Sequence, residues 1–366
     1  MSSDESKLRM LADRAGRQWP ALFEAQRQAL EVKEIIEKAI QSNLGSLGED
    51  LDLVLLGSLA RKEWTSGSDV DWLLLVDGQS SPEHQEYAHK IPRILSDIEY
   101  SGERLRAPGN TGVFGRLVFS HDLVHLVGGD TDSNHNLTRR MLLLLESTPA
   151  RVDARSGNAW TRVLTQIIKR YIENARRFQD EGFDVPRFLL NDVIRFWRTM
   201  CVDFAWKEWE QGEKKWAIRN VKLRMSRKLI FVAGLLATLA SDWLFPTEVG
   251  AHLGKMQGAY DREMSKFRTL LFSFLSPAEI VATACINAQL DDLAVDLFTH
   301  YDQFLEMIGT VSTRKHLEEL KQEDHAEDDT FQEFRQNSHR FQGVLESMFF
   351  DPVSPFSART RKYGLF

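Results

Sequence analysis

The chain has 366 residues, of which 43% are hydrophobic and 27% are charged, and this composition is typical of a folded globular protein with room for two domains. Its formal net charge of −7 argues against a protein whose whole surface coats nucleic acid. Two cysteines, Cys201 and Cys285, are too few for a disulfide framework and favour a reducing compartment. The first residues do not resemble a signal peptide, and the longest apolar run, 229–240, is too short to span a bilayer. We therefore expect a cytoplasmic protein without a membrane partner.

The first part of the chain predicts one helical segment followed by strands. Apolar residues in 7–44 have helical spacing, and Gly45 ends this run. Short apolar runs then predict strands at 53–56 and 70–76, with about one and a half helical turns between them. Two further strands are expected at 115–119 and 123–127.

Beyond these strands the pattern is helical almost to the end, because apolar residues recur three or four positions apart. The predicted helices are 137–146, 160–181, 187–210, 216–240, 260–274, 277–308 and 331–350. We expect an α+β protein in which a small mixed β-sheet domain is followed by an all-helical domain. The expected divisions are an N-terminal helical segment at 1–45, the sheet domain at 46–150, the helical domain at 151–350 and a tail at 351–366.

The second predicted strand begins with two carboxylates that indicate a metal site. Asp69 and Asp71 are two residues apart, so in a strand both project to the same face, while Val70 and Trp72 face the other way. Adjacent carboxylates repel each other unless a cation lies between them. Mg²⁺ is the natural cation, since it prefers oxygen ligands and keeps positions open for substrate phosphates.

The end of the first predicted strand indicates a phosphate site. Gly57 allows close approach of the backbone, and Ser58 adds a hydroxyl donor at the start of a short helix. A phosphate site beside a metal site predicts that the protein binds a nucleotide. Arg61 and Lys62, on the following turn, are either phosphate ligands or solvated side chains.

The order of these features (apolar strand, Gly57-Ser58, about ten residues, then Ser68-Asp69-Val70-Asp71) resembles the DNA polymerase beta-like nucleotidyltransferase superfamily. The resemblance covers residues 53–76. It implies a nucleotidyltransferase catalytic domain at 46–150 that uses two Mg²⁺ ions, with Mn²⁺ as a substitute. The implied reaction moves a nucleoside monophosphate from a nucleoside triphosphate to an acceptor hydroxyl and releases pyrophosphate.

The same resemblance implies a third carboxylate on a neighbouring strand, which would help to hold the acceptor-side metal. Asp122 is our choice, because it lies beside the third predicted strand region. Asp130 and Asp132 follow Gly128-Gly129 and are the alternatives.

The segment 214–228 carries seven basic residues and no acidic one. Arg219, Lys222 and Ser226 are expected on one helical face, where they are either solvated or bind phosphate. The resemblance favours binding, since members of the superfamily commonly contact the triphosphate from the helical domain. Arg139 and Arg140, on the predicted helix 137–146, either bind a ligand or pair with carboxylates.

The sequence does not identify the acceptor. It could be a nucleic acid end, a second nucleotide, a protein hydroxyl or a small molecule, and the product could be an oligonucleotide made in a bacterial defence or toxin system with a partner protein encoded nearby. Self-nucleotidylation would use a hydroxyl of the tail, from Ser357, Thr360 or Tyr363. The alternative from another class is a non-catalytic nucleotide sensor with the same fold.

Overall fold

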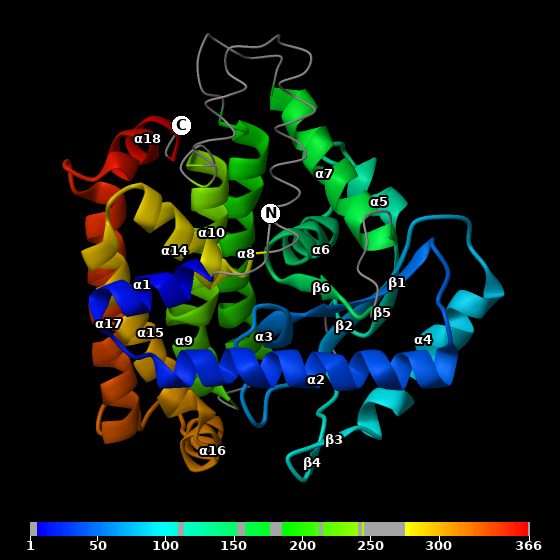
Figure 1. The fold of residues 1–366 in the computed structure, drawn as a ribbon, viewed down its shortest axis with the longest axis horizontal. Helices are drawn as coiled ribbons and strands as arrows, with labels where there is room; N and C mark the ends of the chain where they lie inside the picture. Colours follow the sequence, from blue (N-terminus) through cyan, green and yellow to red (C-terminus); the bar gives the residue numbers. More distant parts are fainter. Residues whose placement is uncertain are drawn as a thin grey trace. The chain divides into compact units, whose positions relative to one another are not determined.

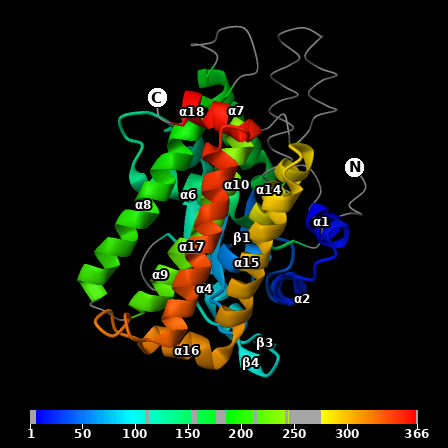
Figure 2. The same cartoon turned by 90° about the vertical axis from the view of Figure 1, so that its left-hand side faces the viewer.

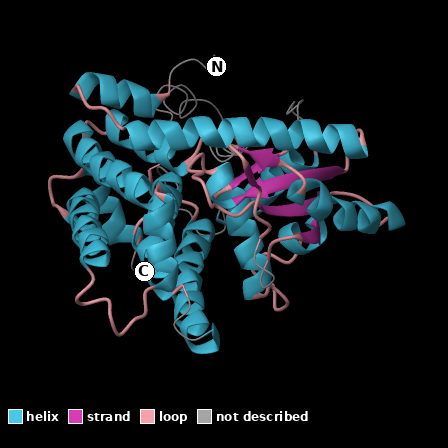
Figure 3. Ribbon diagram, turned by 90° about the horizontal axis from the view of Figure 1, so that it is seen from below, coloured by secondary structure: helices cyan, strands magenta, loops and turns pink. Residues whose placement is uncertain are grey.

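The computed structural model describes residues 6–108, 113–151, 158–175, 185–211, 215–240, 244 and 275–364. Contacts divide the chain into two compact units. The sheet unit is built mainly from residues 25–174, and the helical unit from the residues before 25 and the helices from α8 onward. The strands in Figure 3 all belong to the sheet unit.

The sheet unit contains a mixed four-stranded sheet with the order β5-β2-β1-β6. The strands are β1 (Leu51–Leu56), β2 (Asp71–Val76), β5 (Arg116–Phe119) and β6 (Ser147–Pro149). β1 pairs antiparallel with β2 and with β6, and β2 pairs parallel with β5. A one-turn helix, α3 (Gly57–Ala60), follows β1 directly. The small mixed sheet expected from the sequence is therefore present, and β6 is an additional strand.

Helices cover both faces of this sheet, as Figure 1 shows. Alternate apolar residues of β1 and β2 pack on α2 (Pro20–Leu44) and α4 (Pro82–Ser96), and this core includes Val70 and Trp72. On the other face the backbone N–H of Trp160 donates to the buried carboxylate of Asp52, 2.8 Å away. This bond fixes the start of α7 (Ala159–Ala175), and α6 (Asn134–Leu145) leads into β6 beside it.

One predicted strand of this unit is wrong. Residues 123–127 were expected to be extended, but Ser120–Val124 form the short helix α5, and the N–H of His125 donates to the carbonyl of His121. Leu123 and Val124 are consecutive and both buried, which an exposed-and-buried alternation does not allow. A separate two-stranded ribbon, β3 (Glu99–Tyr100) and β4 (Glu103–Arg104), was not expected.

The helical unit begins with α1 (Lys7–Ala15) and the first residues of α2. Its remaining helices follow in chain order: α8 (Arg187–Gln211), α9 (Trp216–Arg224), α10 (Ser226–Leu239), α14 (Pro277–Asn287), α15 (Asp291–Gly309), α16 (Val311–Glu319), α17 (Asp329–Phe350) and α18 (Pro355–Tyr363). Helices α15 and α17 run side by side (Figure 2), with an aromatic core that includes Tyr301 and Phe341. None of the helices in the described ranges is long and apolar enough to cross a bilayer.

Three predicted helical segments are interrupted. The segment 7–44 divides into α1 and α2, because α1 ends at its C-cap Gly16, whose φ is +60°. The predicted helix 216–240 breaks at Met225, whose φ of −113° and ψ of −87° are not helical. The predicted helix 277–308 breaks at 288–290, where Gln289 has a φ of +59°. The predicted helix 260–274 lies outside the described residues.

The boundaries of the units also differ from the expected domains. The N-terminal helical segment 1–45 is shared, because residues up to Glu24 belong to the helical unit and those from Ala25 to the sheet unit. Helix α7 was expected in the helical domain, but almost all of it belongs to the sheet unit.

Candidate functional site

The site is built around the turn between β1 and α3. Gly57 has a φ of +67°, a conformation that side chains disfavour. A Cβ at this position would lie 2.7 Å from Oδ2 of Asp71. The register explains this proximity, because Leu56 pairs directly with Asp71. Only glycine therefore lets this backbone turn approach the carboxylate so closely.

Asp69 and Asp71 share one face of the chain. Val70 and Trp72 are each 1% exposed and belong to the core under α2 and α4, so the two aspartates point to the opposite face. Asp69 precedes β2 and forms an isolated bridge with Arg106. Its exposed carboxylate has no hydrogen bond or ion pair to any residue that the structure describes. The arrangement thus leaves oxygen atoms directed to a place next to the Gly57 turn.

These residues fit a divalent cation of the Mg²⁺ type. The donors are carboxylate oxygens, which such cations prefer, and the missing side chain at Gly57 lets the backbone turn lie directly beside Oδ2 of Asp71. Over the described part of the chain, no group of three or more His, Cys, Asp and Glu side chains is arranged to hold a metal. The pair alone therefore carries the candidate metal site.

Asp122, the predicted third carboxylate, does not form a three-acid metal group with this pair among the described residues. It lies on α5, past the Phe119 end of β5, and Phe119 pairs with Val76 at the far end of β2 from Asp71. The alternative Asp132 accepts hydrogen bonds from both terminal guanidinium nitrogens of the buried Arg140, at 2.8 and 2.6 Å. Asp130 is exposed in the loop before α6.

The basic residues near the turn have different environments. Arg61 is not a phosphate ligand here, because it binds the buried carboxylates of Glu63 and Glu146. The Ser58 hydroxyl is half-buried and has no hydrogen-bond partner among the described residues. Ser58 thus remains available for a ligand, while Arg61 joins α3 to the end of α6.

A group of three basic side chains on the aspartate face was not predicted as a unit. It consists of Arg116 on β5 and of His135 and Arg139 on α6, and we call it the cationic cluster. Burial and the two arginines lower the pKa of His135, and burial and Arg116 lower the pKa of Arg139. The i, i+4 spacing of His135 and Arg139 was visible in the sequence, but their proximity to Arg116 depends on tertiary structure.

The basic segment of the helical unit is not one continuous face. Arg219 and Lys222 lie on α9, whereas Ser226 begins α10 after the break at Met225. Ser226 is 6% exposed, and its hydroxyl donates to the carbonyl of Lys222. These residues belong to the helical unit and the aspartates to the sheet unit, so their contact with a triphosphate stays a prediction.

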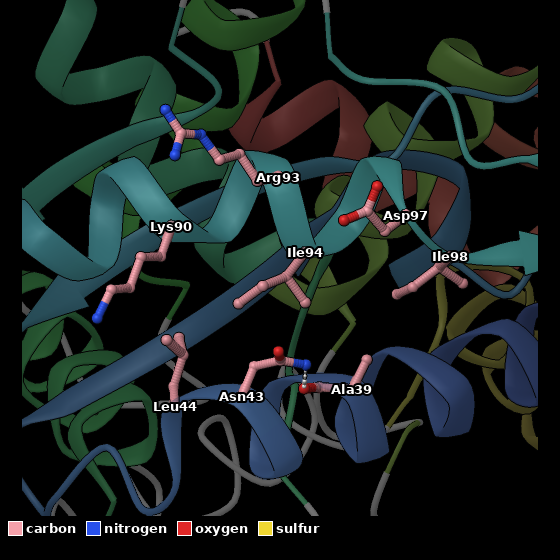
Figure 4. A pocket seen from close by; sticks show the side chains of 8 residues that line it. All are labelled: Ala39, Asn43, Leu44, Lys90, Arg93, Ile94, Asp97 and Ile98. Carbon is pink, nitrogen blue, oxygen red and sulfur yellow. Dashed lines mark hydrogen bonds between the residues drawn. The ribbon is translucent and has the colours of Figure 1, made fainter.

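A surface hollow of about 470 Å³ lies between α2 and α4 (Figure 4). Both helices cover the sheet face opposite to the aspartates. The charged side chains that line it are Lys90, Arg93 and Asp97. It is separate from the Gly57 turn and supplies no group to the candidate site.

Comparison with known proteins identifies the part of the chain that contains this geometry. Residues 33–101 match the family model of the nucleotidyltransferase domain, and this range includes Gly57, Ser58, Asp69 and Asp71. The match confirms the resemblance to the DNA polymerase beta-like superfamily and supports nucleotidyl transfer as the general chemistry of this unit. No curated protein matches the chain.

Proposed function

We propose that the protein is a cytoplasmic, Mg²⁺-dependent nucleotidyltransferase that moves a nucleoside monophosphate from a nucleoside triphosphate to an acceptor hydroxyl. The observation that carries this proposal is the close approach of the Gly57 turn to Asp71, within the range that matches the family model. It puts a backbone turn suited to phosphate beside carboxylates suited to a cation. The triphosphate and the metal ion bound to it would both be held between the Gly57 turn and the carboxylates.

In this proposal the acceptor oxygen forms a bond to the α-phosphorus, and the bond from that phosphorus to the β-phosphate oxygen breaks. Pyrophosphate leaves, and the hydroxyl proton passes to solvent. Gly57 and Ser58 would hold the β- and γ-phosphates, while Asp69 and Asp71 would hold two Mg²⁺ ions. The ions would supply charge neutralisation at the phosphates. Asp122 as a third ligand, and Arg219, Lys222 and Ser226 as triphosphate ligands, stay predictions.

The test is the variant Asp71→Asn, assayed for pyrophosphate release with labelled triphosphates and Mg²⁺. We expect a loss of at least about a hundredfold, because the amide has no negative charge with which to bind the metal. Asp97→Asn is the matched control, since Asp97 is exposed in the same unit but lies at the C-terminal cap of α4. Undiminished turnover by Asp71→Asn would refute the proposal.

A nucleotide sensor without catalysis is the rival function. Thermal melting with each triphosphate, with and without Mg²⁺, separates the two. Stabilisation that needs neither the metal nor Asp71, together with no pyrophosphate release by the wild type, would favour the sensor. We propose further that the enzyme acts in a bacterial defence or toxin system, together with a partner protein that is encoded nearby.

Self-nucleotidylation is also part of the open question of the acceptor. The three candidate hydroxyls differ in their exposure and in their hydrogen bonds. Ser357 is 2% exposed, and the Thr360 hydroxyl donates to the carbonyl of Phe356 within α18. Labelled protein among the products would identify this route, and Tyr363, which is half-buried, would be the first residue to replace.

A further inference from the structure

The cationic cluster lies on the same sheet face as the catalytic aspartates. Arg116 pairs with Leu73 in the parallel register, and Leu73 is two residues after Asp71 on the same face of β2. Burial agrees with this placement, because Leu117 and Phe119 pack on the core under α2 and α4. Arg116 therefore points to the other face, where α6 supplies His135 and Arg139.

The cluster and the Gly57 turn flank the aspartates from opposite sides. In the sheet order β5-β2-β1-β6, β2 carries Asp71, β1 leads to Gly57, and β5 carries Arg116. Neighbouring strands are about 4.8 Å apart, and two residues along a strand span about 6.7 Å. Arg116 lies beside Leu73, two residues from Asp71 along β2. The extended side chain of Arg116 is therefore long enough to reach the surroundings of Asp71.

The positive charge of the two arginines in the cluster is not fully compensated by nearby carboxylates. Nε of Arg139 is buried without a hydrogen-bond partner, and no ion pair of Arg116 or Arg139 occurs within the ranges described. Asp122 is the acid that acts on Arg139, and it raises the pKa of Arg139 less than burial and Arg116 lower it. Arg139 is partly buried and Arg116 is exposed, and two like charges with one of them partly buried are unfavourable unless an anion joins them.

We infer that Arg116, His135 and Arg139 bind a phosphate group of the acceptor, so that the acceptor is a phosphorylated nucleoside, either free or at the end of a short strand. This inference rests on the proposed function. The donor triphosphate would occupy the β1 side, at Gly57 and Ser58, which leaves the β5 side for the molecule that supplies the hydroxyl. Guanidinium groups are well suited to this role, because they donate two parallel hydrogen bonds to one phosphate.

The first test measures binding without metal by calorimetry, with adenosine 5′-monophosphate, adenosine and inorganic phosphate as probes. We expect the monophosphate to bind and adenosine to bind at least about tenfold more weakly. Arg116→Gln and Arg139→Gln should each weaken monophosphate binding about tenfold, the equivalent of about 1.4 kcal/mol. Arg93→Gln is the control, because Arg93 is an exposed arginine on α4 of the same unit. Ser58→Ala should affect triphosphate binding and leave monophosphate binding unchanged.

The second test measures transfer to two acceptors, a dinucleotide with a 5′-phosphate and the same dinucleotide without it. The wild type and Arg93→Gln should prefer the phosphorylated acceptor about tenfold or more, whereas Arg116→Gln and Arg139→Gln should lose this preference. Arg139→Lys keeps a positive charge and should retain part of it. Melting curves identify any variant that fails to fold, and Arg116 is exposed on an edge strand, so its replacement tests the site even if Arg139 proves necessary for folding.

The two proposals fail in different ways. Absence of pyrophosphate release with every acceptor would overturn the proposed function, and the binding measurement would still decide the cluster's role. Transfer that ignores the acceptor phosphate, or that goes mainly to a protein or a neutral molecule, would overturn the inference alone. Equal monophosphate binding by the wild type and both glutamine variants would do the same.

Discussion

Gly57 shows how one residue can be required by two independent constraints. Its φ of +67° excludes most side chains on conformational grounds, and the 2.7 Å approach to Asp71 Oδ2 excludes a Cβ on steric grounds. The second constraint concerns the site directly, because any shift of Asp71 moves a proposed metal ligand.

Replacing Gly57 by alanine should therefore cost both stability and activity. The left-handed conformation alone costs about 1–2 kcal/mol, and displacement of Asp71 should lower transfer by about tenfold or more. Gly102→Ala is the matched control, since Gly102 has a φ of +81° but nothing within 4 Å of its Cβ position. Chemical denaturation should show a loss in both variants, whereas transfer should fall only in Gly57→Ala. Full activity in Gly57→Ala would contradict the close approach.

At the scale of elements, a buried ion-pair network fixes α3 against the end of α6. Arg61 is 10% exposed and binds Glu63 and Glu146, which are 3% and 7% exposed. Arg61 Nε lies 2.9 Å from Glu63 Oε2. Since α3 is only one turn long and begins at Gly57, this network holds the turn that the proposed triphosphate would contact.

Arg61→Met should destabilise the sheet unit strongly, because it leaves two carboxylates buried without their cation. The expected loss is about 3–5 kcal/mol in the free energy of unfolding. Arg104→Met removes an exposed pair with Glu99 in the same unit and should leave the denaturation midpoint nearly unchanged. An Arg61→Met variant as stable as the wild type would show that the network contributes nothing to the fold.

At the scale of the whole molecule, the two ends of the chain belong to one unit. Trp19 is 1% exposed and packs on Phe298 of α15, with ring centroids 5.5 Å apart. The N–H of Leu22 donates to Asp302 of the same helix at 2.8 Å. The first helices thus complete the core of the helical unit, although the sheet unit separates them from it in the sequence.

Trp19→Ala should destabilise the helical unit by about 3–5 kcal/mol, as expected for a large buried side chain. Cys285 reports on this unit, because it is fully buried and burial raises the pKa of its thiol, so it reacts only when the unit opens. Thiol labelling of Cys285, followed by mass spectrometry, should accelerate in Trp19→Ala. It should not accelerate in Trp206→Ala, since Trp206 is 55% exposed in the same unit. Unchanged labelling in Trp19→Ala would contradict the shared core.

The sequence by itself determined the α+β class, the two central strands and the nucleotidyltransferase resemblance. Those features depend on residues close together in the chain: the apolar run before Gly57, and the alternation of Asp69 and Asp71 with buried Val70 and Trp72. Such local spacing fixes which side chains share a face before any long-range contact forms.

Tertiary structure alone decided what lies beside those residues. The pairing of Arg61 with Glu146, the packing of Trp19 on Phe298 and the meeting of Arg116 with Arg139 join residues that are far apart in the sequence. Strand register and helix packing bring them together, and a shift of one residue in either strand would turn Arg116 to the other face. The same reason applies to Asp122: the sequence did not reveal that β5 runs parallel to β2, nor that Asp122 lies on α5 beyond the Phe119 end of β5.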